Sequence, residues 1–149
     1  MSNRYGMEIR AAGAQEAAGL SELLAQVGIS LPPHEVAQRL EAIRQSTGTA
    51  LVALAWGPPS GVVVVHWHRT LLSPAPQAGI SLLLVAPDER RRGIGRLLLK
   101  AAAQAARTAG CDTLDMAVSG DQPDLDAFCL ANGFTGAGLR YRRPLRKGG

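Results

Sequence analysis

Hydrophobic and polar positions alternate in some segments of this chain and recur at helical spacing in others. A short alternating run at Met7–Ala11 predicts a strand, and residues 14–27 carry hydrophobic side chains at helical spacing up to a stop at Gly28. A second amphipathic helix is expected after Pro32 and Pro33, with hydrophobic and charged side chains on opposite faces. The chain is therefore expected to open with a strand and two helices.

The middle of the chain has the composition of extended strands. Residues 50–56 and 61–70 are rich in β-branched and other hydrophobic side chains, and they flank the turn sequence Gly57-Pro58-Pro59-Ser60. This arrangement favours an antiparallel hairpin. A third run of the same kind, residues 79–85, predicts another strand after a proline-containing loop.

The second half alternates between helical and extended patterns. An alanine-rich helix is expected from Ile94 to Gly110, a strand over residues 113–118, and a helix that Asp121-Gln122-Pro123 opens and Asn132-Gly133 closes. Residues 134–145 would then supply a last strand or hairpin. The predicted fold class is α/β in the α+β sense, a mixed, mainly antiparallel central sheet flanked by helices, in one domain over residues 1–149.

Composition limits the number of domains, the cellular location and the kinds of site that this chain is expected to have. A chain of 149 residues with 46% hydrophobic content can bury one core. It has no run of about 20 hydrophobic residues and no signal-peptide pattern at its start, so a cytoplasmic protein without a membrane partner is expected. The two cysteines, Cys111 and Cys129, suggest neither a disulfide framework nor zinc ligation, so no metal site is expected.

Charge is concentrated in two places. Sixteen basic and twelve acidic residues give a formal net charge of +4, and nine of the basic side chains lie within residues 90–96 and 140–147. Such charge suits nucleic acid or a small polyanion. The chain has only two Tyr, two Trp and two Phe and no basic segment interleaved with aromatic residues, which argues against a nucleic-acid partner.

The first basic segment joins the expected strand that ends at Val85 to the alanine-rich helix. The first N–H groups of a helix lack partners within the helix and lie at the positive end of its dipole, where they bind anions. Gly93 and Gly95 have no Cβ atom to keep a phosphate away. The arginines there are unfavourable for the helix dipole unless an anion joins them. The sequence therefore predicts a phosphate site.

Two familiar phosphate-binding motifs do not fit this segment. A Walker loop requires Lys and then Ser or Thr after its glycines, but Gly95 is followed by Arg96 and Leu97. A dinucleotide-binding loop requires Gly or Ala where this chain has Leu98, which is too large for close packing of the helix on the strand. Neither a nucleotide triphosphatase nor a dinucleotide enzyme is expected.

The pattern Arg90-x-x-Gly93-x-Gly95 after Leu83-Leu84-Val85 resembles the acetyl-coenzyme A signature of the GNAT superfamily of N-acetyltransferases, and Asn132-Gly133-Phe134 resembles a frequent ending of that family. The resemblance implies acetyl-coenzyme A as co-substrate. Backbone groups of Leu83 and Val85 would hold the pantetheine arm between the fourth and fifth strands, and amides of residues 91–96 would hold the pyrophosphate. The implied cofactor-binding residues are Leu83, Leu84, Val85, Arg90, Arg91, Arg92, Gly93, Ile94, Gly95, Arg96 and Gln122, the last in place of a frequent Asn.

The usual catalytic side chains of the family are missing. Many relatives carry a Glu base on the fourth strand, where this chain has Gly79, and a Tyr near the end of the last helix, where it has Cys129. His66 and His68 lie two apart on one strand, so they share a face, and a neutral imidazole can take a proton from an ammonium group. The candidate catalytic residues are therefore His66, His68 and Cys129, whose thiol would lie near the acetyl donor. The alternatives are a solvent-facing histidine pair and a Cys129 that only packs in the core.

The expected function is transfer of an acetyl group from acetyl-coenzyme A to a primary amine of a small molecule or peptide, directly in a ternary complex. The alternative is a coenzyme A-binding sensor or scaffold that has lost catalysis, because both usual catalytic positions are changed. The sequence leaves the acceptor and the oligomeric state open, with a homodimer among the alternatives.

Overall fold

A computed structural model describes residues 3–4, 6–90, 92–118 and 122–145 of the chain. Its residues fall into two compact units, Met1–Met116 and Ala117–Gly149, which are considered separately below. Of the residues predicted to bind a cofactor, Arg91 lies outside the described part of the chain.

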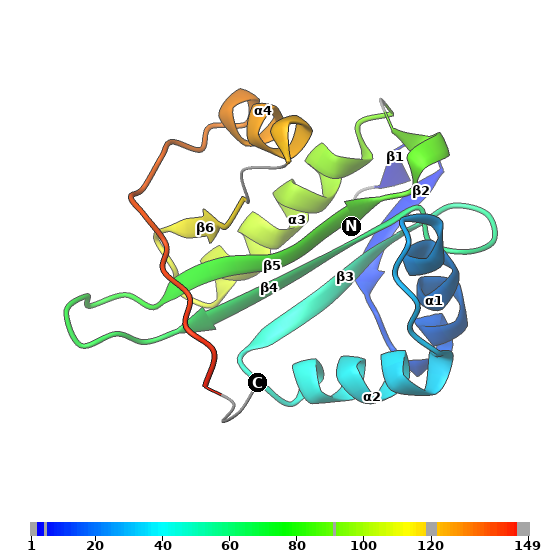
Figure 1. The fold of residues 1–149 in the computed structure, drawn as a ribbon, viewed down its shortest axis with the longest axis horizontal. Coiled ribbons are helices and arrows are strands. Elements are labelled where there is room, and N and C mark those ends of the chain that lie inside the picture. Colours follow the sequence, from blue (N-terminus) through cyan, green and yellow to red (C-terminus); the bar gives the residue numbers. More distant parts are fainter. Residues whose placement is uncertain (1–2, 5, 91, 119–121, 146–149) are drawn as a thin grey trace. The chain divides into compact units, whose positions relative to one another are not determined.

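The first unit contains a six-stranded sheet in the order β1-β2-β3-β4-β5-β6 (Figure 1). All neighbouring strands pair antiparallel except β5 and β6, which pair in parallel. The predicted mixed, mainly antiparallel sheet is therefore confirmed. The strands are β1 (Asn3–Arg4), β2 (Met7–Ala11), β3 (Gly48–Leu54), β4 (Gly61–His68), β5 (Gln77–Val85) and β6 (Leu114–Met116).

Helices cover both faces of this sheet, because side chains of successive strand residues point to opposite faces. On one face, Val52, Val62 and Val64 share a core with α1 (Ala17–Gln26) and α2 (Pro33–Arg44), and the short helix η1 (Ala14–Glu16) precedes α1. On the other face lies α3 (Ile94–Thr108), whose Ile94 and Leu98 are buried and approach Gly61 of β4. The predicted flanking helices are therefore present (Figure 1).

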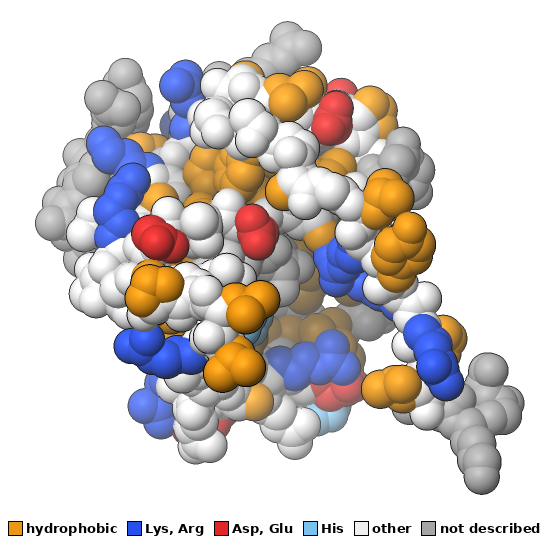
Figure 2. Space-filling view, turned by 90° about the vertical axis from the view of Figure 1, so that its left-hand side faces the viewer, with side chains coloured by type: hydrophobic (Ala, Val, Ile, Leu, Met, Phe, Trp, Pro, Cys, Tyr) orange, Lys and Arg blue, Asp and Glu red, His pale blue; other side chains and the backbone are white. Residues whose placement is uncertain are grey.

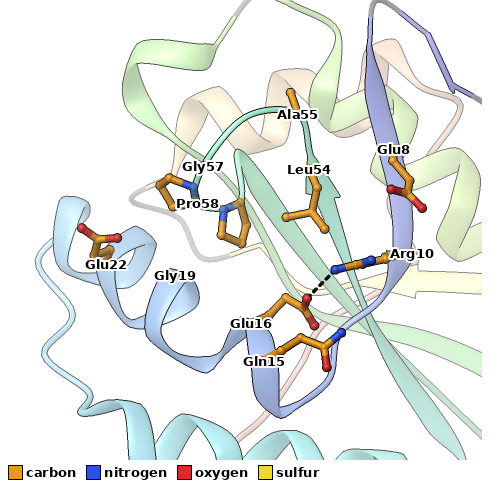
Figure 3. Close-up of a pocket in the computed structure, with 11 residues that line it drawn as sticks. Glu8, Arg10, Gln15, Glu16, Gly19, Glu22, Leu54, Ala55, Gly57 and Pro58 are labelled. Atoms are coloured by element: carbon orange, nitrogen blue, oxygen red, sulfur yellow. Dashed lines mark hydrogen bonds and ion pairs between the residues drawn. The ribbon is translucent and has the colours of Figure 1, made fainter.

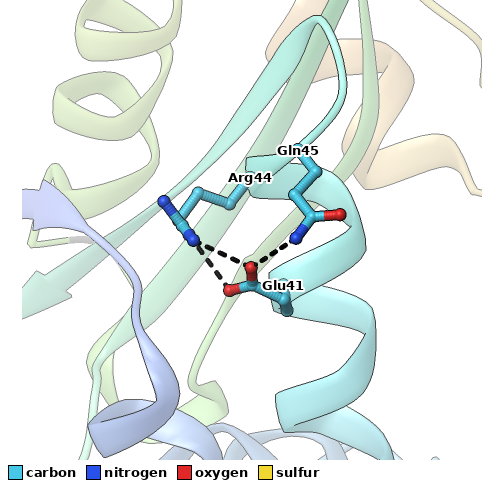
Figure 4. Close-up of polar contacts among 3 residues, drawn as sticks. All are labelled: Glu41, Arg44 and Gln45. Carbon is cyan, nitrogen blue, oxygen red and sulfur yellow. Dashed lines mark hydrogen bonds and ion pairs between the residues drawn. The ribbon is translucent and has the colours of Figure 1, made fainter.

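The last turn of α2 has an exposed cluster of polar contacts (Figure 4). Glu41 accepts hydrogen bonds from Arg44 Nε at 3.0 Å and Nη2 at 2.8 Å, and from Gln45 Nε2 at 2.8 Å. The bond from Arg44 and then the bond from Gln45 lower the pKa of the Glu41 carboxyl. These contacts support the end of the helix just before β3 begins.

In the second unit, α4 (Pro123–Ala131) follows Gln122, and Gly133 with a φ of +91° continues the chain after the helix. The predicted last strand or hairpin at residues 134–145 is wrong, because these residues have no strand structure. Gly138 there takes a φ of +105°, outside the strand region, and no other strand of this unit is described. Alternating hydrophobic residues predict a strand only where a partner strand is available.

None of the described helices has the length and hydrophobicity that a membrane span needs.

Candidate active site

The start of α3 presents main-chain N–H groups that have no hydrogen-bond acceptor among the described residues. Gly93 caps the helix in the left-handed conformation, with a φ of +78°, and no side chain caps it. The first bond of the helix runs from Leu97 N–H to the Gly93 carbonyl at 3.1 Å. The amides of Ile94, Gly95 and Arg96 therefore precede the helical hydrogen-bond ladder, which is the arrangement that binds an anion.

The side chains around this helix start are mostly cationic. Arg90, Arg92 and Arg96 are exposed, and the first turn of α3 contains no acidic residue. Glu89 lies just before the helix in η2 (Pro87–Glu89) and forms an ion pair with Arg92. Positive side chains beside the positive end of a helix dipole are unfavourable alone, so this segment favours a bound anion.

The main-chain groups of β5 change direction from one residue to the next, and two hydrogen bonds establish their sense. Ala86 N–H donates to the Ser60 carbonyl next to β4, at 2.8 Å. Counting back from Ala86, Leu84 also faces β4, whereas Val85 and Leu83 turn their N–H and C=O groups to the opposite edge. At the start of the strand, Ala78 N–H donates toward β6, to the Thr113 carbonyl at 3.2 Å.

That opposite edge is paired only in part. The ladder between β5 and β6 covers Ala78–Ile80, and β6 lies beside the first part of β5 (Figure 1). Within the unit that contains the sheet, Leu83 and Val85 thus direct their main-chain groups to an edge beyond the end of the β6 ladder. This edge leads through Ala86 and η2 directly to the start of α3.

His66 and His68 lie near the end of β4 on the face that carries Val62 and Val64, as their alternation predicts. His66 is half-buried and stands directly opposite Gly79 of β5, whereas His68 is exposed and stands opposite Gln77. The imidazole of His66 is therefore attached opposite the position where the family resemblance expects a Glu. The structure distinguishes the two histidines, which the sequence left equivalent.

Ser81 is a partner of His66 that the sequence analysis did not identify. The Oγ atom of Ser81 lies 2.9 Å from His66 Nε2, within hydrogen-bond distance. The pairing of β4 with β5 shifts by one residue between Val64 and Val65, which makes Ser81 an extra residue in β5. Alternation alone could not reveal this contact, because it depends on the position of the bulge.

Gln122 and Cys129 belong to the second unit and are described within it. Gln122 is the N-cap residue of α4, and its carbonyl accepts the Asp126 N–H at 3.0 Å. Cys129 is buried, and burial raises the pKa of its thiol, with the nearby Asp126 adding to the effect. A raised pKa reduces the thiolate fraction at neutral pH, which supports the packing interpretation of Cys129.

A separate hollow of about 490 Å³ lies beside β2, the start of α1 and the turn before β4 (Figure 3). Arg10 points toward Glu16 there and donates a hydrogen bond from Nη2 to Oε2 at 2.8 Å, and Glu16 Oε1 accepts the Gly13 N–H at 2.7 Å. These bonds satisfy the buried Glu16 carboxylate. None of the predicted site residues that the structure describes lines this hollow.

Figure 2 shows the described side chains of one face. There, Lys and Arg side chains lie in small groups, with hydrophobic and uncharged side chains between them. A long nucleic-acid backbone calls for a continuous positive track. The charge near the start of α3 is better matched to a compact anion.

Comparison with known proteins finds a family profile that matches most of the chain. The family profile described as "Acetyltransferase (GNAT) family" matches residues 20–134 of the chain, which include β5, the start of α3 and both histidines. No curated protein matches the chain significantly.

Solved structures with the same fold are numerous, although their sequences have diverged. A putative acetyltransferase from Agrobacterium tumefaciens is 26% identical, with a TM-score of 0.79 over 91% of this chain and 99% of its own. Glucosamine-6-phosphate N-acetyltransferase from Arabidopsis thaliana is 18% identical, with a TM-score of 0.78 over 94% of this chain and 99% of its own. An acetyltransferase from Trypanosoma brucei is 19% identical, with a TM-score of 0.79 over 93% and 99% of the two chains.

Proposed function

This chain belongs to the GNAT family of acetyltransferases, and on that basis we propose that it transfers the acetyl group of acetyl-coenzyme A to a primary amine of a small molecule or a protein. The observation that carries the proposal is the edge of β5 beyond the β6 ladder, which leads into an uncapped helix start. One extended ligand with a pyrophosphate at one end and hydrogen-bonding amides along its arm suits both features. We propose the cytoplasm as the site of this reaction.

The pyrophosphate would bind the amides of Ile94, Gly95 and Arg96. Each hydrogen bond to a charged group contributes about 1.5–3 kcal/mol, so three amides can anchor a flexible ligand. Arg90 and Arg92 would add long-range attraction. Arg91 and Gln122 remain cofactor contacts expected from the family resemblance.

The pantetheine arm would lie along β5 and exchange hydrogen bonds with the main chain of Leu83 and Val85. Leu84 turns its main-chain groups to β4, so its contribution would be to pack the sheet. A strand rises about 3.3 Å per residue, so the edge from Val85 back to Ser81 extends about 13 Å. The thioester end of the arm would then approach the residues where β5 and β6 part.

At that end the amine would attack the thioester carbonyl carbon in a ternary complex. A C–N bond forms, the C–S bond breaks, and a main-chain amide of β5 at this end of the edge would stabilise the oxyanion. The nitrogen must lose a proton, and the described part of β3, β4 and β5 carries no carboxylate to take it. His66 would act as base, because it is half-buried and lies opposite Gly79, whereas His68 is exposed.

The test is release of coenzyme A from acetyl-coenzyme A in the presence of kanamycin, spermidine, phenethylamine or a short peptide with a free N-terminus, with the acetylated amine identified by mass. At least one amine should be acetylated faster than water hydrolyses the thioester. His66→Ala should slow that reaction by about tenfold or more, and His68→Ala should change it little.

A sensor or scaffold that binds acetyl-coenzyme A without transfer is the second candidate, favoured by Gly79 and Cys129 at the two usual catalytic positions. Saturable binding of acetyl-coenzyme A with no acetylated product from any class of amine would select this candidate. Absence of binding would reject both.

A further inference from the structure

Ser81 is the one residue by which β5 departs from regular pairing with β4. Ile80 stands opposite Val65 and Leu82 opposite Val64, so Ser81 has no partner of its own across the ladder. Such a bulge re-aims the side chain that it carries. Here it brings Ser81 Oγ to 2.9 Å from His66 Nε2, on the sheet face that carries Val64.

The imidazole of His66 is held by its surroundings as well as by this contact. Gly48 of β3 stands opposite His66, and a Cβ atom on Gly48 would lie 2.9 Å from His66 Nδ1. The same Cβ atom would lie 2.9 Å from the Val65 carbonyl oxygen. Real Cβ atoms do not come so close, so a larger residue at position 48 would force the ring or the backbone beside it to shift. The absence of a side chain at Gly48 and the extra residue at Ser81 together determine where His66 lies.

Ser81 also occupies the point where β5 and β6 part. Ile80 is the last β5 residue in the parallel ladder, and Ser81 is the next along the chain. The Ser81 side chain is exposed, whereas His66 is half-buried. An amine approaching the thioester at this end of the edge would therefore reach the Ser81 hydroxyl more readily than the His66 ring.

We propose that Ser81 is a catalytic residue that passes the proton of the acceptor amine to His66, an inference that rests on the proposed acetyl transfer. As the amine nitrogen bonds to the carbonyl carbon, Ser81 Oγ takes a proton from nitrogen and releases its own to His66 Nε2. The C–S bond breaks, and sulfur leaves with the electron pair. The imidazolium then gives its proton to solvent and the thiolate takes one from solvent, so the cycle closes without another reagent.

The relay requires one tautomer of His66, with the proton on Nδ1, so that Nε2 accepts the Ser81 hydroxyl. Nitrogen-15 shifts of the imidazole in the protein without ligand report this tautomer directly, with no need for an acceptor. The expected result is Nδ1–H in the parent and a changed tautomer balance in Ser81→Ala. A proton on Nε2 in the parent would overturn the relay.

The kinetic test uses the most reactive amine of the panel named above. Ser81→Ala should lower kcat by about tenfold or more and remove the inflection that a histidine base produces in the pH–rate profile. Ser81→Thr keeps the hydroxyl and should retain most of kcat. The double variant with His66→Ala should be no slower than the slower single variant, because the two side chains act in one step.

One control variant and two outcomes separate the relay from the reaction itself. Ser46→Ala removes an exposed serine hydroxyl at the end of α2 and should leave kcat unchanged. If Ser81→Ala matched the parent in kcat and in pH profile, the relay would be wrong and acetyl transfer would stand. If the parent bound acetyl-coenzyme A and acetylated no amine, the proposed transfer would fail and the relay with it.

Discussion

At the scale of single residues, the environment of each side chain decides its chemistry more than its type does. The sequence placed His66 and His68 on one face, and that alternation is correct. It could not indicate which of the two is the better candidate for the base. The ranking depends on the residue across the sheet: His66 stands opposite Gly79, and Ser81 approaches it only because β5 has an extra residue. A bulge leaves no clear pattern of hydrophobic positions, so Ser81 could not be predicted from the sequence.

Gly79 offers a direct test of where the base acts. Among the described residues, a Cβ atom on Gly79 would meet only the Asp115 carbonyl oxygen, at an ordinary contact distance of 3.9 Å, so the backbone there has room for a Cβ atom. We expect Gly79→Glu to restore activity to His66→Ala, with the rate inflection moved to lower pH, because a carboxyl group ordinarily releases its proton at lower pH than an imidazolium does. Gly79→Gln is the control of equal size, and equal rescue by Gln would show that the carboxylate takes no proton.

Cys129 should be dispensable for catalysis. Burial raises the pKa of its thiol, so we expect iodoacetamide to react with it slowly at pH 7 and faster as the pH rises toward that pKa. Cys129→Ala should change turnover by less than about threefold, with the effect confined to stability, as expected for a small truncation in a core. Cys111→Ala is the matched control, because burial also raises the pKa of that thiol. A tenfold loss of turnover in Cys129→Ala alone would assign the thiol a chemical role.

At the scale of helices and strands, periodicity predicted most elements to within a few residues. The predicted ends of α3 and α4 lie close to the observed ones because glycine, proline and asparagine mark them. It failed at residues 134–145, where alternation is present and a strand is not. A helix satisfies its own hydrogen bonds, whereas a strand depends on a partner that the local sequence does not reveal.

The start of α3 carries its own prediction. Gly95→Val places a branched side chain where phosphate is expected to meet the amides, so we expect acetyl-coenzyme A to bind at least about tenfold more weakly. Isothermal titration calorimetry measures this loss, and thermal unfolding without ligand checks that the fold persists. Gly95→Ala adds a single methyl group, and its affinity for acetyl-coenzyme A should lie between those of the parent and of Gly95→Val. Unchanged affinity in Gly95→Val would place the pyrophosphate elsewhere.

At the scale of the whole molecule, the unit Met1–Met116 holds the edge of β5, the start of α3 and the His66–Ser81 contact. The fold class could be predicted because most helices and strands are encoded locally, whereas the phosphate segment at residues 90–96 stays a prediction. Two of the expected residues, Gln122 and Cys129, belong to the other unit, and their parts in the reaction rest on the family resemblance.

Ligand binding should stabilise the whole chain. A ligand present at 100 times its Kd that binds only the folded state contributes about 2.7 kcal/mol to the free energy of unfolding. For a chain of this size that corresponds to a rise in Tm of roughly 5–10 °C, and acetyl-coenzyme A should produce it. Pantetheine, which lacks the pyrophosphate, should produce a smaller rise at the same concentration. Equal Tm with and without acetyl-coenzyme A at millimolar concentration would contradict the proposed function.

The orientation of Leu83 and Val85 bears on how such a protein can diverge. Their main-chain groups, rather than their side chains, border the edge beyond the β6 ladder, and all residue types except proline carry the same N–H and C=O groups. Selection for coenzyme binding would therefore act weakly on residue identity at these two positions. Replacement of either by proline is the substitution that such selection would remove first.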